Sequence, residues 1–414
     1  MILTEGLWSR LPLEIIDRVL SFLPVPVLCR FRCVCRRWNV LISKPSFHDL
    51  CDLNGRKETY LFVTRYLIYS DWCYVDPTFI RTMCFLDLDA RRWYSIKADE
   101  HRGLYDDLED DVPPVVYDTR IVAMDDGLVC DLIRKYDTLT VLVVSDPIAQ
   151  MSNHLPALSC PADEALPIIV MAVDSVARTY RVFFVNNRAR ADTRIFVYES
   201  ATNKWRGLRN APERLGVSAA LSAVYFREAL YMIFQTDAWN KYVVLSYNMQ
   251  EDMWREISVR FPDKPSNPQL VVRDNRLFLL VWSFIRSRER GSSSSFEVNE
   301  VLVDWNASKR VLQITSAHLQ SYFDEEPVDI AYGIPCVDSN GLCSSIILVS
   351  NVSGKVITYN AVNGAVDVLP AHPLGEASLL MEEVDFDGLP VYETYAGKHM
   401  NLSVRDVLSQ GLFT

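Results

Sequence analysis

The histidines and cysteines of this chain are the side chains that could bind a metal ion or supply a nucleophile. The sequence contains six histidines and ten cysteines. No Cys-x-x-Cys pair occurs, and no histidines show the spacing of zinc ligands. The histidines stand apart from one another at His48, His101, His154, His318, His372 and His399. We therefore predict no metal site and no cofactor.

The common catalytic motifs are also missing from the sequence. It has no Gly-x-Ser-x-Gly nucleophile elbow, no phosphate-binding glycine loop and no His-Glu-x-x-His pair. These motifs carry much of acyl transfer, phosphoryl transfer and zinc-dependent hydrolysis. We therefore predict that the chain has no catalytic residue and is not an enzyme.

Charge is distributed unevenly along the 414 residues. Residues 1–50 carry seven Lys/Arg and four Asp/Glu, a net charge of +3, and the overall charge of −11 leaves −14 for the remainder. An acidic surface repels nucleic acids and anionic membranes, so we expect neither as a partner. A basic protein partner is compatible with this charge.

The sequence shows no feature of secretion or membrane insertion. The cysteines show no pairing pattern, no signal peptide precedes the helical pattern, and apolar runs such as 277–282 are too short to cross a bilayer. We expect the protein in the cytoplasm, the nucleus or both.

Residues 11–42 have the pattern of three short helices. Pro12 can open the first helix, because a proline is tolerated in a first turn. The apolar residues that follow have helical spacing and end at a proline: Ile15, Ile16, Val19, Leu20, Leu23 and then Pro24. A second helix fits between Pro26 and Cys33, and a third fits from Cys35 to Ile42.

This helical stretch has more apolar side chains than so small a unit can bury. Helical units of roughly 40 residues usually need a staple or a partner. Apolar surface left over on such a unit usually marks a protein-binding face. Two alternatives remain open, a helical subdomain packed on the rest of the chain and a helix-turn-helix using Arg30, Arg32, Arg36 and Arg37.

The stretch resembles an F-box. The resemblance is carried by Leu11-Pro12, Glu14, Ile15-Ile16, the run Val-Leu-Ser-Phe-Leu-Pro at 19–24, Leu28, Arg30, Arg32, the run Val-Cys-Arg-Arg-Trp at 34–38, and Leu41-Ile42-Ser43. In that family the motif binds the Skp-type adaptor of a Skp–cullin–F-box ubiquitin ligase. The resemblance implies that the adaptor contacts Leu11, Pro12, Ile15, Ile16, Val19, Leu20, Leu23, Pro24, Leu28, Val34, Cys35, Trp38 and Leu41.

From residue 60 onward the sequence is rich in short β-type runs, and one element recurs. An apolar strand ends, a polar turn follows, and a second strand begins seven residues after an anchor. The anchors are Leu86, Val144, Tyr198, Tyr247, Val303 and Tyr359. Their spacing of 49 to 58 residues fits a four-stranded propeller blade with its loops.

We therefore predict a mainly β protein, in which a three-helix F-box is followed by a six-bladed β-propeller, with seven blades as an alternative. Trp93, Trp205 and Trp254 each open an outer strand, where the ring can fill the wedge between blades. Strands at 379–386 and 389–395 could complete the blade begun at 60–63. The predicted domains are 1–54 for the F-box and 55–414 for the propeller.

The propeller part resembles the kelch or F-box-associated propellers that follow F-boxes, especially in plants. Thr202-Asn203-Lys204-Trp205 carries this likeness, whereas the double glycine of kelch repeats is absent. Together the resemblances imply a substrate receptor that holds an adaptor, and through it a cullin, and recruits a protein target of unknown identity. A non-ligase scaffold or transcription-cofactor protein is the alternative. A propeller enzyme is a third reading, because the strand–turn–Trp element has the outline of a sialidase Asp-box without its glycine.

Overall fold

In the computed structural model, the fold is defined over two regions, a short helical part and a much longer part built of β-strands. The structure describes residues 12–23, 25–32, 34–42, 44, 46–47, 50–51, 54, 58–68, 81–87, 91–98, 117–125, 128–135, 140–146, 151–158, 167–174, 176–177, 179–186, 194–212, 216–237, 241–262, 265–287, 291–323, 330–337, 342–350, 355–370 and 391–402.

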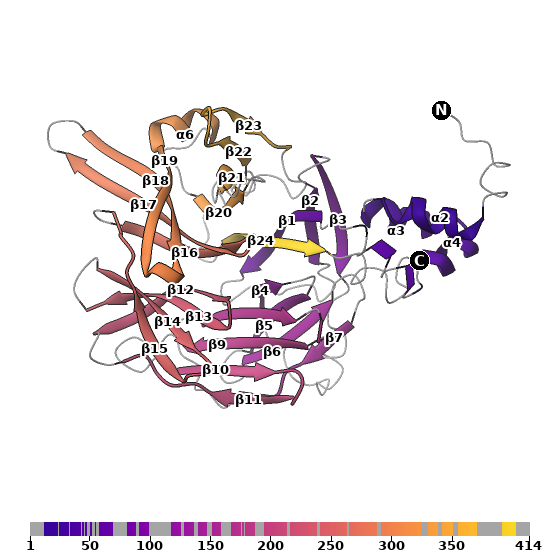
Figure 1. The fold of residues 1–414 in the computed structure, drawn as a ribbon, viewed down its shortest axis with the longest axis horizontal. Helices are drawn as coiled ribbons and strands as arrows, with labels where there is room; N and C mark the ends of the chain where they lie inside the picture. The colour runs from indigo at the N-terminus through magenta and orange to yellow at the C-terminus, as the bar shows by residue number, and fades with distance from the viewer. Residues whose placement is uncertain are drawn as a thin grey trace, which may run out of the picture.

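The helical part contains α2 (Leu13–Leu20), α3 (Val25–Arg32) and α4 (Arg36–Ile42), close to the predicted bounds. Pro12 caps α2, and its carbonyl accepts hydrogen bonds from the amides of Ile15 and Ile16 at 3.1 and 3.2 Å. Helical residues continue at 46–47 and 50–51, beyond the three predicted helices. Figure 1 shows α2, α3 and α4 grouped to one side of the strands, near β3.

The β part contains six four-stranded antiparallel sheets among the described residues. Sheet 1 consists of β24 (Val391–Leu402), β1 (Glu58–Ile68), β2 (Arg81–Asp87) and β3 (Arg92–Ala98). Sheet 2 is β4 (Tyr117–Asp125), β5 (Leu128–Lys135), β6 (Thr140–Asp146) and β7 (Met151–His154). Sheet 3 is β8 (Ile168–Asp174), β9 (Thr179–Asn186), β10 (Arg194–Glu199) and β11 (Lys204–Gly207).

Sheet 4 is β12 (Val217–Phe226), β13 (Ala229–Thr236), β14 (Tyr242–Asn248) and β15 (Met253–Ile257). Sheet 5 is β16 (Pro265–Arg273), β17 (Arg276–Ser287), β18 (Gly291–Leu302) and β19 (Ala307–Thr315), with the short 3-10 helix η3 (Val303–Trp305) between its last two strands. Sheet 6 is β20 (Ile330–Val337), β21 (Cys343–Ser350), β22 (Val356–Asn360) and β23 (Val366–Val368). Helix α6 (Ser316–Phe323) connects sheets 5 and 6.

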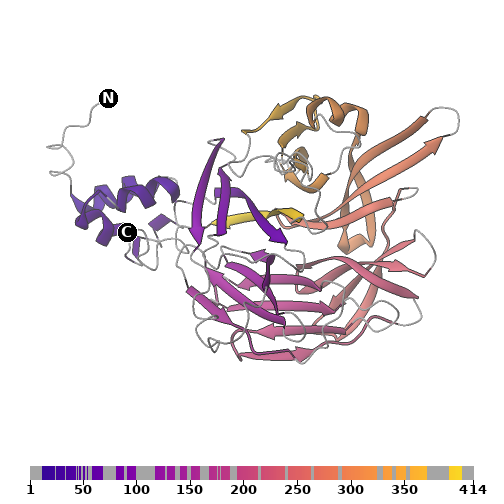
Figure 2. The same ribbon diagram turned by 180° about the vertical axis from the view of Figure 1, so that it is seen from behind.

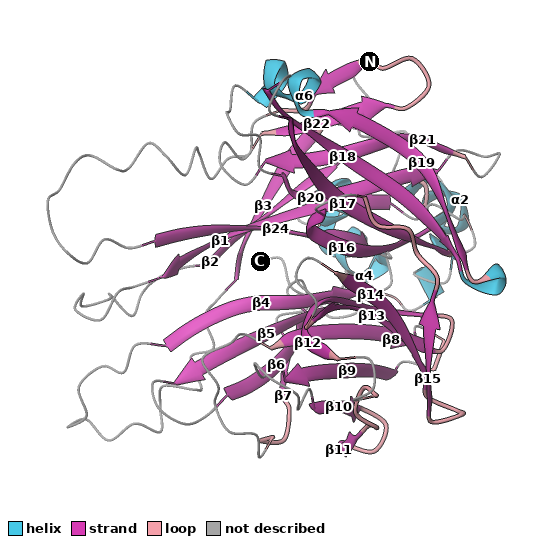
Figure 3. Ribbon diagram, turned by 90° about the vertical axis from the view of Figure 1, so that its left-hand side faces the viewer, coloured by secondary structure: helices cyan, strands magenta, loops and turns pink. Residues whose placement is uncertain are grey.

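The sheets form a ring around their innermost strands. Each innermost strand contacts the next one, in the order β4, β8, β12, β16, β20 and β24, and β24 contacts β4. Figures 1 and 2 show the sheets fanning out from this centre, and Figure 3 shows that strands make up most of the ribbon. The predicted mainly β fold with a β-propeller is therefore confirmed.

A strand near the C-terminus closes the ring. β24 pairs with β1, so that Glu58 lies opposite Leu402 and Tyr60 lies opposite Met400. This confirms the prediction that a C-terminal strand completes the sheet begun at 60–63. The other predicted closing strand, 379–386, lies outside the described residues.

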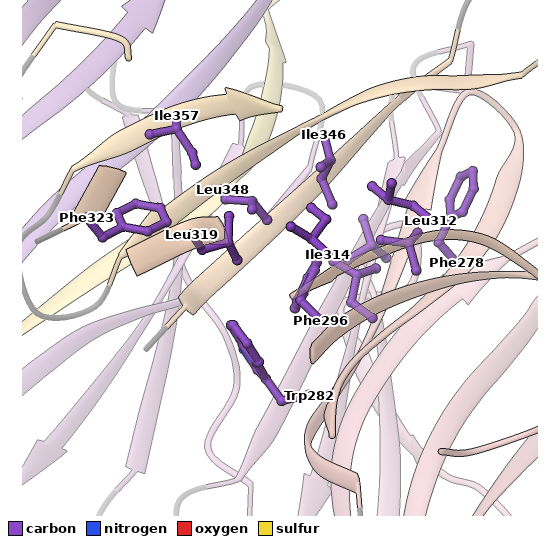
Figure 4. Packing of buried hydrophobic residues seen from close by; sticks show 13 residues of the cluster. Phe278, Trp282, Phe296, Leu312, Ile314, Leu319, Phe323, Ile346, Leu348 and Ile357 are labelled. Carbon is purple, nitrogen blue, oxygen red and sulfur yellow. The ribbon is translucent and has the colours of Figure 1, made fainter. Parts of the chain in front are cut away.

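Apolar side chains fill the spaces between adjacent sheets. β17 is buried on both faces, which explains its unbroken apolar run. Phe278 and Leu280 face sheet 6, whereas Leu277 and Leu279 face sheet 4. Figure 4 shows the layer between sheets 5 and 6, where Leu319 and Phe323 of α6 pack beside Leu348 and Ile357. The helix thus closes the outer end of this layer.

The repeated hairpin has the predicted register in four sheets and a different register in two. The anchors Leu86, Tyr198, Tyr247 and Tyr359 each pair with the residue seven positions later. In sheet 2 the prediction is wrong by one residue, because Ser145 pairs with Ser152. In sheet 5 it is wrong by two, because Val301 pairs with Ser308 and Val303 belongs to η3. Val301 and Val303 have the same parity along a strand, so the apolar pattern does not distinguish them.

The fifth position after the anchor has a left-handed backbone wherever it is described. Arg91, Asn203, Asp252, Asn306 and Gly364 have φ between 47° and 72°. Asn, Asp and Gly are the residues that tolerate this region best. Two of the three tyrosine anchors add a hydrogen bond to this position: the hydroxyl of Tyr198 donates to Asn203 Oδ1 at 2.9 Å, and that of Tyr247 donates to Asp252.

The tryptophans that open the outer strands of sheets 1, 3 and 4 lie between adjacent sheets, as predicted, and each also donates a hydrogen bond to the preceding sheet. Trp205 Nε1 donates to the carbonyl of Pro156 at 2.7 Å, and Trp254 Nε1 donates to that of Arg209 at 2.9 Å. Trp93 Nε1 donates to the carbonyl of Pro370 at 2.7 Å, which joins sheet 1 to sheet 6. In sheet 5 the equivalent residue is Ser308, whose hydroxyl accepts from the amide of Arg260 at 3.0 Å.

Replacing Trp93 with alanine should weaken the closure of the ring. The substitution removes one hydrogen bond and the packing of an indole between sheets 6 and 1, so we expect the free energy of unfolding to fall by about 2 kcal/mol or more. Urea unfolding measures this change. Trp305→Ala is the control, because that side chain is 81% exposed. Equal midpoints for the two variants would contradict the assigned role of Trp93.

The left-handed position can be tested at Asn203. Asn203→Ala places an alanine at a φ of 53° and removes the acceptor for Tyr198, so we expect a loss of about 1–2 kcal/mol. Asn203→Gly removes only the acceptor and should retain more stability. Thermal unfolding of both variants gives the comparison, and an alanine variant as stable as the glycine variant would refute the backbone argument.

Candidate protein-binding surface

The helical part has a stripe of exposed apolar side chains. Ile15, Val19 and Phe22 are 46%, 42% and 52% exposed, and their spacing of four and three residues places them on one side of α2 and its end. Val34 and Val40 are each 61% exposed. We call Ile15, Val19 and Phe22 the apolar stripe, and Val34 and Val40 add exposed apolar surface just before and within α4. Five large apolar side chains exposed on so short a segment favour contact with another protein.

The opposite side of α2 forms the interior of the helical part. Ile16 and Leu20 are buried, at 1% and 0% exposure, together with Leu28, Leu41 and Ile42. The apolar residues of α2 therefore serve two purposes: the buried ones hold the helices together, and those of the apolar stripe face outward.

The predicted contact residues fall into three groups. Pro12, Ile15, Val19, Val34 and Cys35 are exposed, and Leu23 and Trp38 are half-buried. Ile16, Leu20, Leu28 and Leu41 are interior. Leu11 and Pro24 lie outside the described residues. Trp38 packs against Phe31 with ring centroids 5.0 Å apart.

The prediction omitted Phe22 and Val40, which are among the exposed apolar residues. Phe22 lies three residues after Val19, so helical spacing alone could have identified it. Val40 lies between the half-buried Trp38 and the buried Leu41, and its exposure depends on how α4 packs.

The arginines of the helical part do not form one basic surface. Arg30, Arg36 and Arg37 are exposed, whereas Arg32 is only 4% exposed and its Nε donates to Asn39 Oδ1 at 3.0 Å. A helix-turn-helix that used all four arginines on DNA would need Arg32 at the surface. Its burial counts against that alternative.

Two polar contacts fix the end of α2. The hydroxyl of Ser21 donates to the carbonyl of Arg18 at 2.9 Å, and Asn54 Nδ2 donates to Ser21 Oγ. Burial raises the pKa of Asp17, while the nearby Lys44 lowers it and Glu14 raises it. Asn54 thus ties the junction that precedes β1 back to the helix bearing the apolar stripe.

The described part of the ring contains no group of three or more His, Cys, Asp or Glu side chains that could hold a metal ion. The His318 ring packs against Tyr322 and Tyr359, at centroid distances of 5.6 and 5.7 Å. Burial raises the pKa of Cys130 well above its usual value and that of Cys343 to about 11. These cysteines are therefore protonated at neutral pH and poor nucleophiles. No helix among the described residues is long and apolar enough to span a membrane.

Comparison with known proteins relates both parts of the chain to one group. Residues 8–50 match the F-box domain. Three Arabidopsis thaliana proteins are similar over longer regions. F-box only protein 6 is 22% identical over 86% of this chain and 68% of its own length. F-box/kelch-repeat protein At3g61590 is 27% identical over 50% of this chain and 47% of its own length. F-box/kelch-repeat protein At3g23880 is 25% identical over 60% of this chain and 65% of its own length.

The chain covers between about half and two thirds of the length of these relatives. Among solved structures, TolB from Acinetobacter baumannii aligns with a TM-score of 0.44 and 11% identity over 80% of this chain and 70% of that chain. The helices with the apolar stripe coincide with the matched F-box residues, and the ring of sheets follows them. Residues 8–50 thus match an F-box domain, a β-propeller follows them in the structure, and over longer regions the chain is similar to F-box/kelch-repeat proteins.

Proposed function

We propose that this protein is the substrate-receptor subunit of a Skp–cullin–F-box ubiquitin ligase. The observation that carries the proposal is the apolar stripe on the helices of an F-box domain. Apolar side chains exposed in this number favour a permanent protein partner, and an F-box domain implies a Skp-type adaptor. Through the adaptor the chain would reach a cullin.

The proposed contact surface is narrower than the predicted one. Pro12, Ile15, Val19, Val34 and Cys35 would touch the adaptor directly, together with Phe22 and Val40. Ile16, Leu20, Leu28 and Leu41 would act by holding the helices in place, because they are already buried. Leu23 and Trp38, which are half-buried, stay predicted contacts, as do Leu11 and Pro24.

The propeller would bind the target protein. We infer that each four-stranded sheet is one blade, which gives six blades, and that the domains are 1–54 and 55–414. The chain would accelerate ubiquitin transfer by proximity alone, because holding a target beside a charged conjugating enzyme converts a bimolecular encounter into an effectively intramolecular one. No catalytic residue of its own is needed, and the complex would act in the cytoplasm or the nucleus.

A non-ligase scaffold remains the second candidate. In that case the propeller would be the binding surface for a transcription or signalling partner, and the F-box helices would only pack within the chain. Co-purification of the tagged chain with both the Skp-type adaptor and a cullin distinguishes the two functions, because only the ligase subunit brings down the cullin.

Charged substitutions in the apolar stripe should abolish adaptor binding without unfolding the domain. We expect Ile15→Asp/Val19→Asp to weaken capture of the Skp-type adaptor at least tenfold, since two carboxylates would be desolvated at the contact. The stability of the chain should be nearly unchanged, because both positions are exposed. A pull-down and a thermal melt give the two readings.

The matched control is Ile16→Asp/Leu20→Asp on the buried side of the same helix. This pair should lower the stability of the helical part as well as adaptor binding, because it buries unpaired carboxylates. If the Ile15/Val19 variant binds the adaptor as the unmodified chain does, the apolar stripe is not the contact surface.

The predicted contacts at the start of the motif have their own test. Leu11→Ala/Pro12→Ala should abolish adaptor pull-down while the circular dichroism of the propeller stays unchanged, because neither residue belongs to the ring. Retained pull-down by this variant would remove Leu11 and Pro12 from the contact surface.

A further inference from the structure

Trp305 differs from the tryptophans that join the sheets. Trp93, Trp205 and Trp254 donate hydrogen bonds to carbonyls of preceding sheets. Trp305 is 81% exposed, and within the described residues no hydrogen bond or ring contact holds its indole. The joint that a tryptophan would make in sheet 5 is made by Ser308 instead. The fold therefore gains little from an indole at position 305.

The backbone beneath this indole is held on both sides by sheet 4. Asp304 Oδ2 lies 3.1 Å from the guanidinium of Arg227, and Asn306 Oδ1 accepts from the amide of Ser258 at 2.8 Å. Trp305 lies between these two anchors in η3. An exposed aromatic on a fixed backbone loses little entropy when it binds, and tryptophan and arginine are enriched at the centres of interfaces.

The turn that supplies Arg227 has an uncommon backbone. Arg227 and Glu228 connect β12 to β13 with φ of 46° and 59°, although neither is glycine or asparagine. This conformation directs Arg227 to Asp304 and Glu228 to Tyr225, whose hydroxyl donates to the carboxylate at 2.9 Å. Arg181 of sheet 3 lies 3.4 Å from the same carboxylate. The turn thus links three sheets next to Trp305.

The charged groups of these turns present carboxylates outward. In the pair Arg181–Glu228 the side chains are 39% and 61% exposed, and in Arg227–Asp304 they are 45% and 75% exposed. Arg273–Asp274, in the turn between β16 and β17, follows the same order at 16% and 49%. In these three pairs the carboxylate is the more exposed partner, whereas in Arg276–Glu300 of sheet 5 the arginine is, at 33% against 16%. Asp304 next to Trp305 and Glu228 next to Arg227 therefore leave carboxylate surface open to an approaching cation.

We infer that Trp305, Asp304 and Glu228 bind a lysine or arginine side chain in a basic segment of the target protein. An indole face attracts a cation, and the neighbouring carboxylates can share it with the arginines they already contact. The charge of −14 on the chain after residue 50 attracts the same kind of segment over a longer range. The inference rests on the proposed receptor role only in naming the occupant as a target.

This position lies on the side of the ring at which the F-box is attached. Arg227 lies in the turn from the first to the second strand of sheet 4, and Trp305 lies in the turn from the third to the fourth strand of sheet 5. In an antiparallel four-stranded sheet these two kinds of turn lie at the same end. In sheet 1 that end holds Glu58, the first residue of β1, opposite Leu402. The far ends of β17 and β18 point away from the F-box helices in Figures 1 and 2. A target bound at Trp305 is therefore on the adaptor side.

Peptide binding to the full-length chain tests the inference. The probe is a short fluorescein-labelled peptide of alternating lysine and glycine, and its glutamate counterpart is the charge control. Trp305→Ala and Asp304→Asn should each weaken binding of the lysine peptide about tenfold in fluorescence anisotropy. Trp305→Phe should retain part of the affinity, because a smaller aromatic face remains.

The matched control is Asp367→Asn, which neutralises a carboxylate that is 57% exposed in an ion pair with Arg91 on another joint of the ring. It should leave binding within about twofold of the unmodified chain. Equal affinity of the Trp305→Ala and unmodified chains, or equal binding of the two peptides, would overturn the inference.

Adaptor capture separates this inference from the proposed function. Trp305→Ala should capture the Skp-type adaptor normally, and Ile15→Asp/Val19→Asp should bind the lysine peptide normally. If Trp305→Ala binds the lysine peptide as the unmodified chain does, while adaptor capture is intact, only the Trp305 site is refuted. If the unmodified chain does not capture the Skp-type adaptor, the ligase role is refuted, whereas the binding of the lysine peptide at Trp305 is unaffected.

Discussion

The pairing of β24 with β1 is the contact on which the rest of the molecule depends. It gives sheet 1 its innermost strand, so that β20 and β4 both have a neighbour across the ring. Without it sheet 1 would have three strands, and β20 and β4 would lose the strand that lies between them. The hydrogen bond from Trp93 to the carbonyl of Pro370 secures the same seam at the periphery, between residues 277 positions apart. Because this closure joins distant parts of the chain, forming it has a large entropic cost of loop closure, and we expect it to form late in folding.

The closure also determines where the F-box sits. Asn54 Nδ2 donates a hydrogen bond to Ser21 Oγ at the end of α2, and β1 begins at Glu58. The helical part and the first paired strand are therefore separated by only residues 55–57. A short connection suits the proposed receptor role, because ubiquitin transfer by proximity would depend on a defined distance between adaptor and bound target.

The sequence allowed the sheets to be predicted where the apolar pattern is regular. β8 has no register shift with its neighbour β9, so its apolar residues keep a regular pattern. β4, β12, β16 and β20 each have a bulge, which breaks the alternation of period two that identifies a strand. The hairpin repeat is recognisable because its four-residue turn and its tyrosine or tryptophan positions lie outside the bulged first strands. In sheet 5, β18 and β19 also have a register shift, and there the predicted hairpin is two residues off.

The binding surfaces were harder to predict, because they depend on packing and register. Ile15 and Ile16 are adjacent and equally apolar, yet one is 46% exposed and the other 1%, a division set by where α3 and α4 lie. In sheet 5 a two-residue error in register concealed that Ser308, not a tryptophan, makes the joint. With the joint already made, the exposed indole three residues earlier contributes little to stability, and exposed apolar surface favours aggregation. An indole at this exposed position is better explained by binding than by folding.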